Sequence, residues 1–331
     1  MSENQSLIAS AGLVAIGRNE GERLRKCLMS VVGRMGKVVY VDSGSTDGSV
    51  NMARNIGVEV VELDMARPFT AARARNEGFW RLREISPELA YVQFVDGDCE
   101  VVPGWLDKAA QFLNEHAGVA VVCGRRRERF PDRSVYNMLC DIEWDTPVGE
   151  ARACGGDAMM RANALQQVGG YRDDLIAGEE PELCVRLRAA GWKIARLDEE
   201  MTLHDAAMTY FGQWWKRATR TGYAYAEGAH LHGALPEQHR VLESRRVWAW
   251  GLGIPVLTAS LTIWLGTWGL VMLLIYPVQV VRLALQGMRS ARENWWRAFF
   301  LVLGKFPEAM GQLNFLYNRL AGKTAHLIEY K

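Results

Sequence analysis

The sequence predicts an α/β fold followed by a helical C-terminal region, and two observations carry this prediction. Up to about residue 230, short apolar runs alternate with amphipathic stretches of helical length, which is typical of βαβ units around a mostly parallel sheet. Between Arg246 and Arg282 the chain contains no Asp, Glu, Lys, Arg or His, which indicates apolar helices. We therefore expect two domains, residues 1–230 and residues 231–331.

The apolar runs of the first domain are short and rich in valine, as buried strands are. Ligands, including nucleotides in Rossmann-like folds, bind outside the carboxyl ends of parallel strands, so polar residues there are the first candidates for a site. We expect strands at 13–16, 37–41, 58–61, 91–95, 119–122 and 158–160, and helices at 21–32, 70–83 and 180–190.

The charge-free segment is long enough for a hairpin of two membrane-spanning helices, residues 247–265 and 267–285. A span needs about 20 mostly apolar residues. Arginines flank the segment on both sides, which places both ends on the cytoplasmic side of a membrane. A further apolar segment, residues 295–305, begins with aromatic residues and predicts a helix lying in the membrane interface. The alternative is a buried helical hairpin in a soluble protein.

Composition narrows the possible classes of function. The formal net charge is +1, which gives no support to nucleic-acid binding. The six cysteines form no C-x-x-C pair and have no neighbouring His pair, so we expect buried thiols in a cytosolic domain rather than a zinc site. The N-terminus begins polar and acidic, unlike a signal peptide. We therefore expect the first domain to stay in the cytoplasm, attached to the inner (cytoplasmic) membrane.

The tripeptide Asp96-Gly97-Asp98 directly follows the strand expected at 91–95. Glycine lets the backbone turn between the two carboxylates and come close to a ligand. Carboxylate oxygens suit Mg²⁺ or Mn²⁺ bound through a diphosphate. An acidic turn after a strand is also a common structural feature, so the tripeptide alone leaves both interpretations open.

A second polar turn, residues 42–48, follows the strand expected at 37–41. Asp42 can accept hydrogen bonds from a base N–H or a ribose hydroxyl. Ser45, Thr46 or Asp47 can also simply cap the next helix, and both interpretations are compatible. The sequence has no G-x-G-x-x-G after the first strand and no G-x-x-x-x-G-K-[ST]. A dinucleotide cofactor and the phosphate loop of ATPases are therefore disfavoured.

Five motifs occur in the order in which family 2 glycosyltransferases carry them, and residues 10 to 225 strongly resemble that family. The resemblance implies a GT-A fold, an inverting reaction and a nucleotide-sugar donor, with UDP-sugars the first candidates. The motifs are Ile16-Gly17-Arg18-Asn19-Glu20, residues 41–49 beginning Val41-Asp42-Ser43-Gly44, Ala72-Arg73-Ala74-Arg75-Asn76-Glu77-Gly78, Val95-Asp96-Gly97-Asp98, and residues 178–187 beginning Gly178-Glu179-Glu180-Pro181.

The resemblance also implies roles for single residues. The donor would contact side chains and backbone of the first four motifs, with Asp42 reaching the base and Arg73 and Asn76 holding the ribose or diphosphate. Asp98, Asp96 and His204 would hold the divalent metal, Mn²⁺ or Mg²⁺, although a lone His is as often structural. The donor-binding set is Arg18, Asn19, Glu20, Asp42, Ser43, Arg73, Asn76, Asp96 and Gly97.

Inversion requires a base that deprotonates the acceptor hydroxyl on the face opposite the leaving group. The family has Glu-Asp at the start of a helix, whereas this chain has Glu179-Glu180, so the resemblance assigns the base to Glu180 and leaves Glu179 as the alternative. Both acids could instead only complement the helix dipole. On the acceptor side the resemblance places Gly155, Gly156 and Asp157. Trp214 and Trp215 could stack on a sugar there, although core packing explains them equally well.

Two departures from the family limit the prediction. Ser43 stands where many members have a second Asp. The segment 213–217 is only a loose match to the Q-x-x-R-W motif of processive synthases, and the spans are too few for a channel, so polymer extrusion is not expected. The sequence therefore predicts transfer of one sugar to a lipid-linked or polysaccharide acceptor at the membrane, as in exopolysaccharide assembly.

Three alternatives remain at the sequence level. A polyprenyl-phosphate monosaccharide synthase would use basic residues at the membrane, and Arg125, Arg126, Arg127 and Arg129 could serve, unless they are a solvated charge run. A catalytically inactive, sugar-binding or scaffolding membrane protein would lack the acids that this chain retains. A nucleotidyltransferase would need a Gly-rich, basic loop after the first strand, which is missing.

Overall fold

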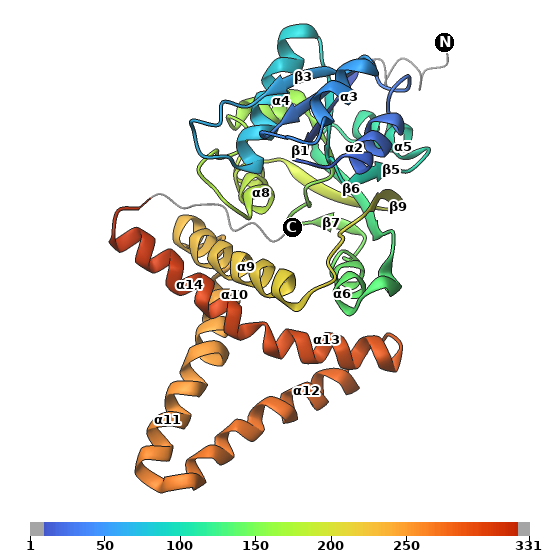
Figure 1. The fold of residues 1–331 in the computed structure, drawn as a ribbon. Coiled ribbons are helices and arrows are strands. Elements are labelled where there is room, and N and C mark those ends of the chain that lie inside the picture. Colours follow the sequence, from blue (N-terminus) through green and yellow to red (C-terminus); the bar gives the residue numbers. More distant parts are fainter. Residues whose placement is uncertain (1–9, 324–331) are drawn as a thin grey trace. The chain divides into compact units, whose positions relative to one another are not determined.

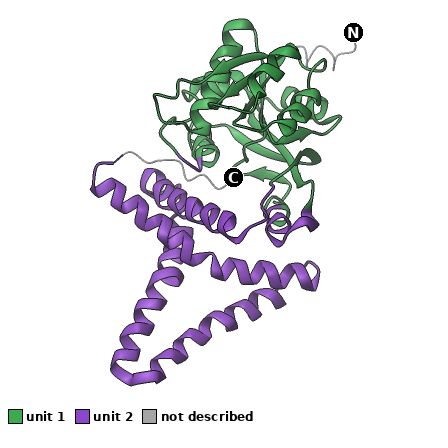
Figure 2. Ribbon diagram, in the orientation of Figure 1, with its two compact units in different colours: residues 1–130, 141–175, 179–206 green, residues 131–140, 176–178, 207–331 purple. Residues whose placement is uncertain are grey.

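The computed structural model describes residues 10–323 and divides them between two units (Figures 1 and 2). Unit 1 comprises residues up to 130 together with 141–175 and 179–206, and unit 2 comprises 131–140, 176–178 and the chain from 207 onward. The main division between these units falls at residue 206, and the domain boundary near residue 230 stays a prediction. Residues 1–9, on which the N-terminal expectation rests, and residues 324–331 lie outside the described part.

Unit 1 is built on a nine-stranded sheet of order β3-β2-β1-β4-β8-β6-β9-β5, with β7 paired to β9 beside this path. The four strands β3, β2, β1 and β4 are parallel, as the alternating pattern predicted. In the other half, β8, β5 and β7 run antiparallel to their neighbours, so the sheet is mixed. The strands are β1 Ala11–Gly17, β2 Lys37–Asp42, β3 Glu59–Glu62, β4 Tyr91–Asp96, β5 Cys99–Val101, β6 Val119–Glu128, β7 Gly149–Ala151, β8 Ala158–Arg161 and β9 Lys193–His204.

The helices of unit 1 cover this sheet and bury its apolar side chains; Leu13, Phe79 and Phe94 are fully buried. Thr70 caps α4 by accepting a hydrogen bond from the Arg73 amide. The helices are α2 Glu22–Met29, α3 Ser49–Asn55, α4 Ala71–Ile85, α5 Trp105–Glu115, α7 Ala162–Gln167 and α8 Glu179–Ala189. A 3₁₀ turn, Pro131–Arg133, and helix α6, Val135–Glu143, lie where the chain passes between the units.

The register of the parallel strands brings the polar turns together. Gly17 is paired with Asp42, and Ile16 with Asp96, so β1, β2 and β4 end at one edge of the sheet. Antiparallel pairing of β5 with β9 sets Cys99 opposite His204. The first, second and fourth sequence motifs therefore meet at this edge, and the fourth lies beside the end of β9.

Unit 2 is helical, and one segment of it, Val241–Leu285, is long and apolar enough to cross a membrane by length and composition. The mean hydropathy of its most apolar 18-residue window is 1.8, and only 11% of that window is buried. The segment turns at Gly266, where a φ of 63° ends α11, and Figure 1 shows α11 and α12 as two diverging arms. The elements are α9 Phe211–His232, α10 Val241–Val247, a π-helical segment Trp248–Gly253, α11 Ile254–Leu265, a 3₁₀ segment Gly266–Leu274, α12 Ile275–Leu285, α13 Ala291–Leu303 and α14 Lys305–Leu320.

Gly78 sets how closely α4 packs on the sheet. A Cβ at this position would lie 2.4 Å from Val14 Cγ1 and 2.9 Å from Val41 Cγ2. We predict that Gly78→Val lowers the free energy of unfolding by about 3 kcal/mol, because the added carbons overpack the core. Urea unfolding of the purified protein measures this. Gly118→Val is the control, since no atom lies within 4 Å of a Cβ there; equal effects of the two substitutions would contradict the prediction.

Candidate active site

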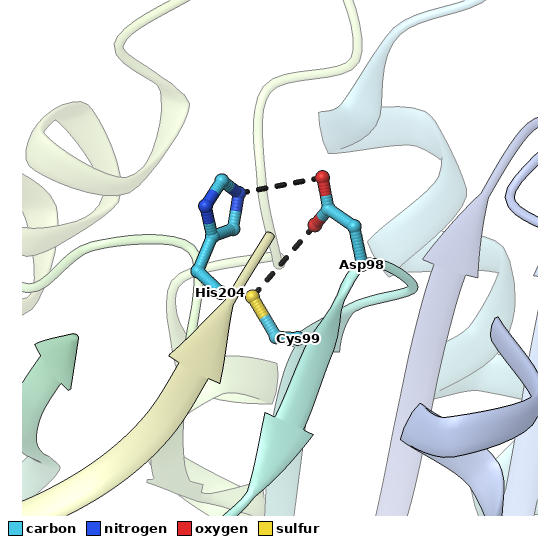
Figure 3. Close-up of side chains that lie close together, drawn as sticks. All are labelled: Asp98, Cys99 and His204. Atoms are coloured by element: carbon cyan, nitrogen blue, oxygen red, sulfur yellow. Dashed lines mark hydrogen bonds and ion pairs between the residues drawn. The ribbon is translucent and has the colours of Figure 1, made fainter. Parts of the chain in front are cut away.

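A carboxylate and an imidazole meet at the ends of β4 and β9 (Figure 3). Asp98 Oδ2 lies 3.3 Å from His204 Nε2, and the Cys99 thiol donates to Asp98 Oδ1 over 3.7 Å. All three side chains are buried, and one potential ligand atom from each lies within 4.8 Å of the others. The arrangement depends on the β5–β9 pairing, which connects residues far apart in sequence.

The chemistry of these groups fits a divalent cation. Carboxylate oxygens suit Mn²⁺ and Mg²⁺, imidazole nitrogen suits transition-metal ions, and thiolate selects softer metals. Burial raises the pKa of Cys99 well above its usual value, so this thiol stays protonated and acts as a hydrogen-bond donor. Asp98 and His204 are therefore the fitting pair, and Cys99 orients the carboxylate.

Asp96, which we predicted to contact the same metal, instead lies between two arginines in this structure. Its Oδ1 is 2.9 Å from Arg75 Nη2, and its Oδ2 is 3.0 Å from Arg126 Nη2. Burial alone would raise the pKa of Asp96, but the charges of Arg75 and Arg126 outweigh it and hold the pKa well below its usual range. Asp96 is thus ionised, and a role in metal or ribose binding remains a prediction.

Arg75 connects Asp96 to the two acids at the start of α8. Its Nη1 lies 2.9 Å from Glu179 Oε1 and 3.0 Å from Glu180 Oε1, and its side chain is only 3% exposed. Burial, and next the charge of Glu179, raise the pKa of Glu180 to about 7, while the charge of Arg75 opposes this. A carboxyl with that pKa can act as a general base at neutral pH.

The expected acceptor-side loop lies against this cluster. A Cβ at Gly156 would be 2.6 Å from Arg75 Nη2 and 2.9 Å from Asp96 Oδ2, so only glycine fits without displacing the ion pairs. Gly155 has open space around it. Asp157 is fully buried; one of its oxygens accepts from the Asp96 amide at 3.0 Å, and the other from the Thr202 hydroxyl at 2.6 Å.

Asp157 also binds the second arginine of the cluster. Its Oδ1 lies 2.7 Å from Arg126 Nη2, and its Oδ2 accepts from Arg126 Nε at 2.9 Å. Asp157 thereby links β4, β6 and β9, and these contacts hold the ends of the three strands together at the site.

The two loops expected to bind the nucleotide are joined by hydrogen bonds. The Asn19 amide donates to Ser45 Oγ at 2.8 Å, and Asn19 Oδ1 accepts from the Thr46 amide at 2.7 Å. Asp42 is buried and accepts from the Tyr40 hydroxyl at 2.7 Å and from the amides of residues 44 and 45. These bonds fix the carboxylate at the strand end.

The remaining residues of this set lie beside the same strand ends. Glu20 forms an ion pair with Arg23 at 2.7 Å, and Arg18 is exposed. Ser43 is buried, and its Oγ has no hydrogen-bond partner within the described chain. The Gly97 amide donates to the residue 16 carbonyl at 2.7 Å, and a Cβ there would lie 3.0 Å from that oxygen, so this close approach favours glycine.

Arg73 and Asn76 hold loops in this structure. Arg73 Nη1 donates to the carbonyls of residues 64 and 67, at 3.0 and 3.3 Å. Asn76 Nδ2 donates to the Tyr171 carbonyl at 2.8 Å, and Asn76 Oδ1 accepts from the Tyr171 amide. Their predicted contacts to ribose or diphosphate stay predictions. Arg75, from the same motif, was not singled out, because helical spacing alone cannot tell which of these side chains reaches the acids of α8.

Two further groups of residues from the sequence analysis have other contacts. Trp214 is buried within unit 2 against Phe211 and Phe300, at ring-centroid distances of 5.5 and 4.7 Å, and Trp215 also contacts Phe211. Aromatic packing thus accounts for both tryptophans in this unit. Each arginine of the run at 125–129 is paired with a carboxylate of unit 1. The pairs are Arg125–Asp141, Arg126–Asp96, Arg127–Glu200 and Arg129–Glu100.

Comparison with known proteins shows which class of enzyme this chain is similar to. Residues 14–166 match the model of Glycosyl transferase family 2. The chain is 23% identical over 217 residues to Glycosyltransferase AglE of Haloferax volcanii, covering 62% of this chain and 69% of that protein. It is 26% identical over 232 residues to Succinoglycan biosynthesis protein ExoA of Rhizobium meliloti, covering 67% and 68%.

A solved structure supports the fold. The mannosyltransferase PcManGT from Pyrobaculum calidifontis, in complex with GDP-Man and Mn²⁺, aligns with a TM-score of 0.59 at 15% identity, over 94% of this chain and 88% of that chain. The fold is therefore the GT-A fold that the sequence predicted, and the protein is a glycosyltransferase enzyme. More narrowly, residues 14–166 match the model of glycosyltransferase family 2, the family that the ordered motifs resemble.

Arg75 offers a direct test of the acidic cluster. We predict that Arg75→Lys lowers kcat for donor turnover on the order of 100-fold, because one ammonium group cannot hold three carboxylates in the geometry of a guanidinium fork. Release of nucleoside diphosphate measures kcat, and circular dichroism checks folding. Arg81→Lys is the matched control on the same helix, where Arg81 pairs with Glu59 at the surface. Equal turnover of both variants would contradict the role of Arg75.

Proposed function

We propose that this glycosyltransferase transfers a sugar, with inversion, from a nucleotide-sugar to a lipid-linked or glycan acceptor at a membrane, with the help of a divalent metal. One observation carries the proposal: Arg75 joins Asp96, two residues before Asp98, to Glu180. The expected metal-binding turn and the expected base are therefore linked through a single side chain.

The donor would lie along the edge formed by β1, β2 and β4. Asp42 and Asn19 stand at the strand end and loop where the resemblance expects the nucleoside, and their carboxylate and amide oxygens can accept further hydrogen bonds. The solved PcManGT complex contains a nucleotide-sugar and Mn²⁺, which supports the same classes of ligand here. UDP-sugars are our first candidates.

A divalent cation held by Asp98 and His204 would neutralise negative charge on the leaving diphosphate. The protein's own residues do the rest. Arg75 and Arg126 fix Asp96 between them. Gly156 lets the acceptor-side loop pass close to this cluster, because a Cβ there would lie 2.9 Å from Asp96 Oδ2 and 3.2 Å from Glu180 Oε1. Glu180, with a pKa near 7, accepts the proton of the acceptor hydroxyl while the oxygen of that hydroxyl attacks the anomeric carbon of the donor sugar.

Unit 2 would attach the enzyme to the membrane. Residues 247–265 and 267–285 would form the two arms of a membrane hairpin, with Trp264 and Trp268, which are 88% and 78% exposed, near its turn. Residues 295–305 would lie in the interface, where Trp295 and Phe299 are exposed. Arginines at both ends of the hairpin support a cytoplasmic position for the catalytic unit at the inner membrane.

Similarity to a succinoglycan biosynthesis protein supports exopolysaccharide or cell-envelope glycan assembly as the setting. The polyprenyl-phosphate synthase alternative gains no support, because the arginines that could bind a lipid phosphate are paired with carboxylates of unit 1. An inactive scaffold is disfavoured because Asp98, Glu179 and Glu180 are all present and assembled.

The test is nucleoside diphosphate release from the detergent-purified enzyme across UDP-, GDP- and dTDP-sugars, with membrane lipid extract as acceptor. We expect one donor to be turned over with Mn²⁺ or Mg²⁺ and not with EDTA. Asp98→Ala and Glu180→Gln should each lose at least about 100-fold in kcat/KM, since one removes a metal ligand and the other the base.

Asp107→Ala is the control, because Asp107 is exposed on α5. Metal-dependent activity that survives Asp98→Ala would exclude its role as a metal ligand. Absence of both turnover and donor binding on every donor would favour a non-catalytic scaffold.

A further inference from the structure

His204 ends β9, which lies between β6 and β5 in the sheet. The residue paired with it on β5 is Cys99, next to Asp98. The residue paired with it on β6 is Glu128, the last residue of that strand. The sheet therefore places a carboxylate on each side of one imidazole: Asp98 toward Nε2, as Figure 3 shows, and Glu128 toward Nδ1.

Glu128 is held rigidly in this position. Its side chain is fully buried, and its Oε2 lies 3.5 Å from His204 Nδ1. The same Oε2 accepts from the Ala206 amide at 3.0 Å, and Oε1 accepts from the Phe130 amide at 3.1 Å. Two backbone donors thus fix the carboxylate, so it cannot turn away from the imidazole without losing them.

The imidazole is restrained from a further side. The ring of Trp144 meets it edge-on, with centroids 4.7 Å apart and an interplanar angle of 77°. A neutral histidine donates from one ring nitrogen and accepts at the other. If Nε2 binds a cation through its lone pair, a neutral His204 carries its proton on Nδ1, where Glu128 is the acceptor that faces it.

We propose that Glu128 is a positioning residue for the metal site: it fixes the tautomer and orientation of His204, so that Nε2 binds the divalent cation together with Asp98. This inference rests on the proposed function, in which Asp98 and His204 hold the metal. Carboxylates that accept a hydrogen bond from a metal-binding histidine orient the ring and raise its basicity as a ligand. Nothing in the sequence pattern singles out Glu128, because the β6–β9 register brings it to His204 from 76 residues away.

A competing explanation is that Glu128 only stabilises the turn after β9 through the two backbone amides. A double-mutant cycle separates the two roles, because a residue that acts through His204 has no effect once His204 is absent. The measurement is the affinity of the full-length, detergent-purified protein for Mn²⁺, followed by the electron paramagnetic resonance signal of free Mn²⁺. Thermal unfolding of each variant runs in parallel.

We expect Glu128→Gln to weaken Mn²⁺ binding about 10- to 100-fold. In a His204→Ala background, the same substitution should change the affinity less than about threefold. Glu100→Gln, which removes a carboxylate from the neighbouring strand β5, is the matched control and should leave the affinity unchanged. If Glu128→Gln fails to fold, Glu128→Asp replaces it, and we expect weaker Mn²⁺ binding only where His204 is present.

The proposal is overturned if Glu128→Gln keeps the affinity of the unaltered protein, or if it lowers the affinity equally with and without His204. The second result would assign Glu128 to the turn alone. Asp98→Ala distinguishes this failure from failure of the proposed function. If Asp98→Ala binds Mn²⁺ normally, or the unaltered protein binds none, the assignment of the metal site is wrong. If Asp98→Ala loses Mn²⁺ binding while Glu128→Gln keeps it, only the proposed role of Glu128 is wrong.

Discussion

The arginine at position 75 holds three carboxylates that would otherwise repel one another in a buried site. Asp96, Glu179 and Glu180 come from the end of β4 and the start of α8, and each lies within 3.0 Å of the Arg75 guanidinium. Burying such charges costs far more free energy than it returns unless they are paired and hydrogen-bonded. The site therefore exists in this form only while α4 keeps Arg75 against the edge of the sheet.

Close packing makes that placement possible. Gly78 lets α4 approach β1 and β2, and Gly156 lets the acceptor-side loop approach Arg75 and Asp96 without a side chain between them. Asp157 and Arg126 then extend the ion pairs toward β6 and β9. Close backbone packing and electrostatics thus act together. The glycines leave space for the charged side chains, and the ion pairs between these side chains fix the strand ends and the start of α8 relative to one another. Burial in this cluster, and next the charge of Glu179, raise the pKa of Glu180 to about 7.

The parallel part of the sheet and the positions of its strand ends could be predicted from the sequence, whereas the rest of the site could not. The parallel strands β1, β2 and β4 are continuous apolar runs, so their ends, and with them Asp42 and Asp96, were placed correctly at one edge. The short strands β5 and β7 and the charged strand β9 have no such pattern, because three residues cannot show a period and β9 alternates only weakly. The pairing of Asp98 with His204 was therefore implied only by family resemblance, and Glu128 was not found at all.

A single direct measurement tests the central claim that this cluster holds Glu180 as a base near neutral pH. Infrared difference spectra of the full-length protein, recorded between pH 5 and 9, follow the carbonyl band of a protonated carboxyl group as it ionises. We expect one carboxyl band that disappears with a midpoint near pH 7, since burial and the charge of Glu179 disfavour ionisation of Glu180 below it. The band should be absent from Glu180→Gln. A spectrum with no carboxyl titrating in that range, or a band that Glu180→Gln retains, would contradict the account.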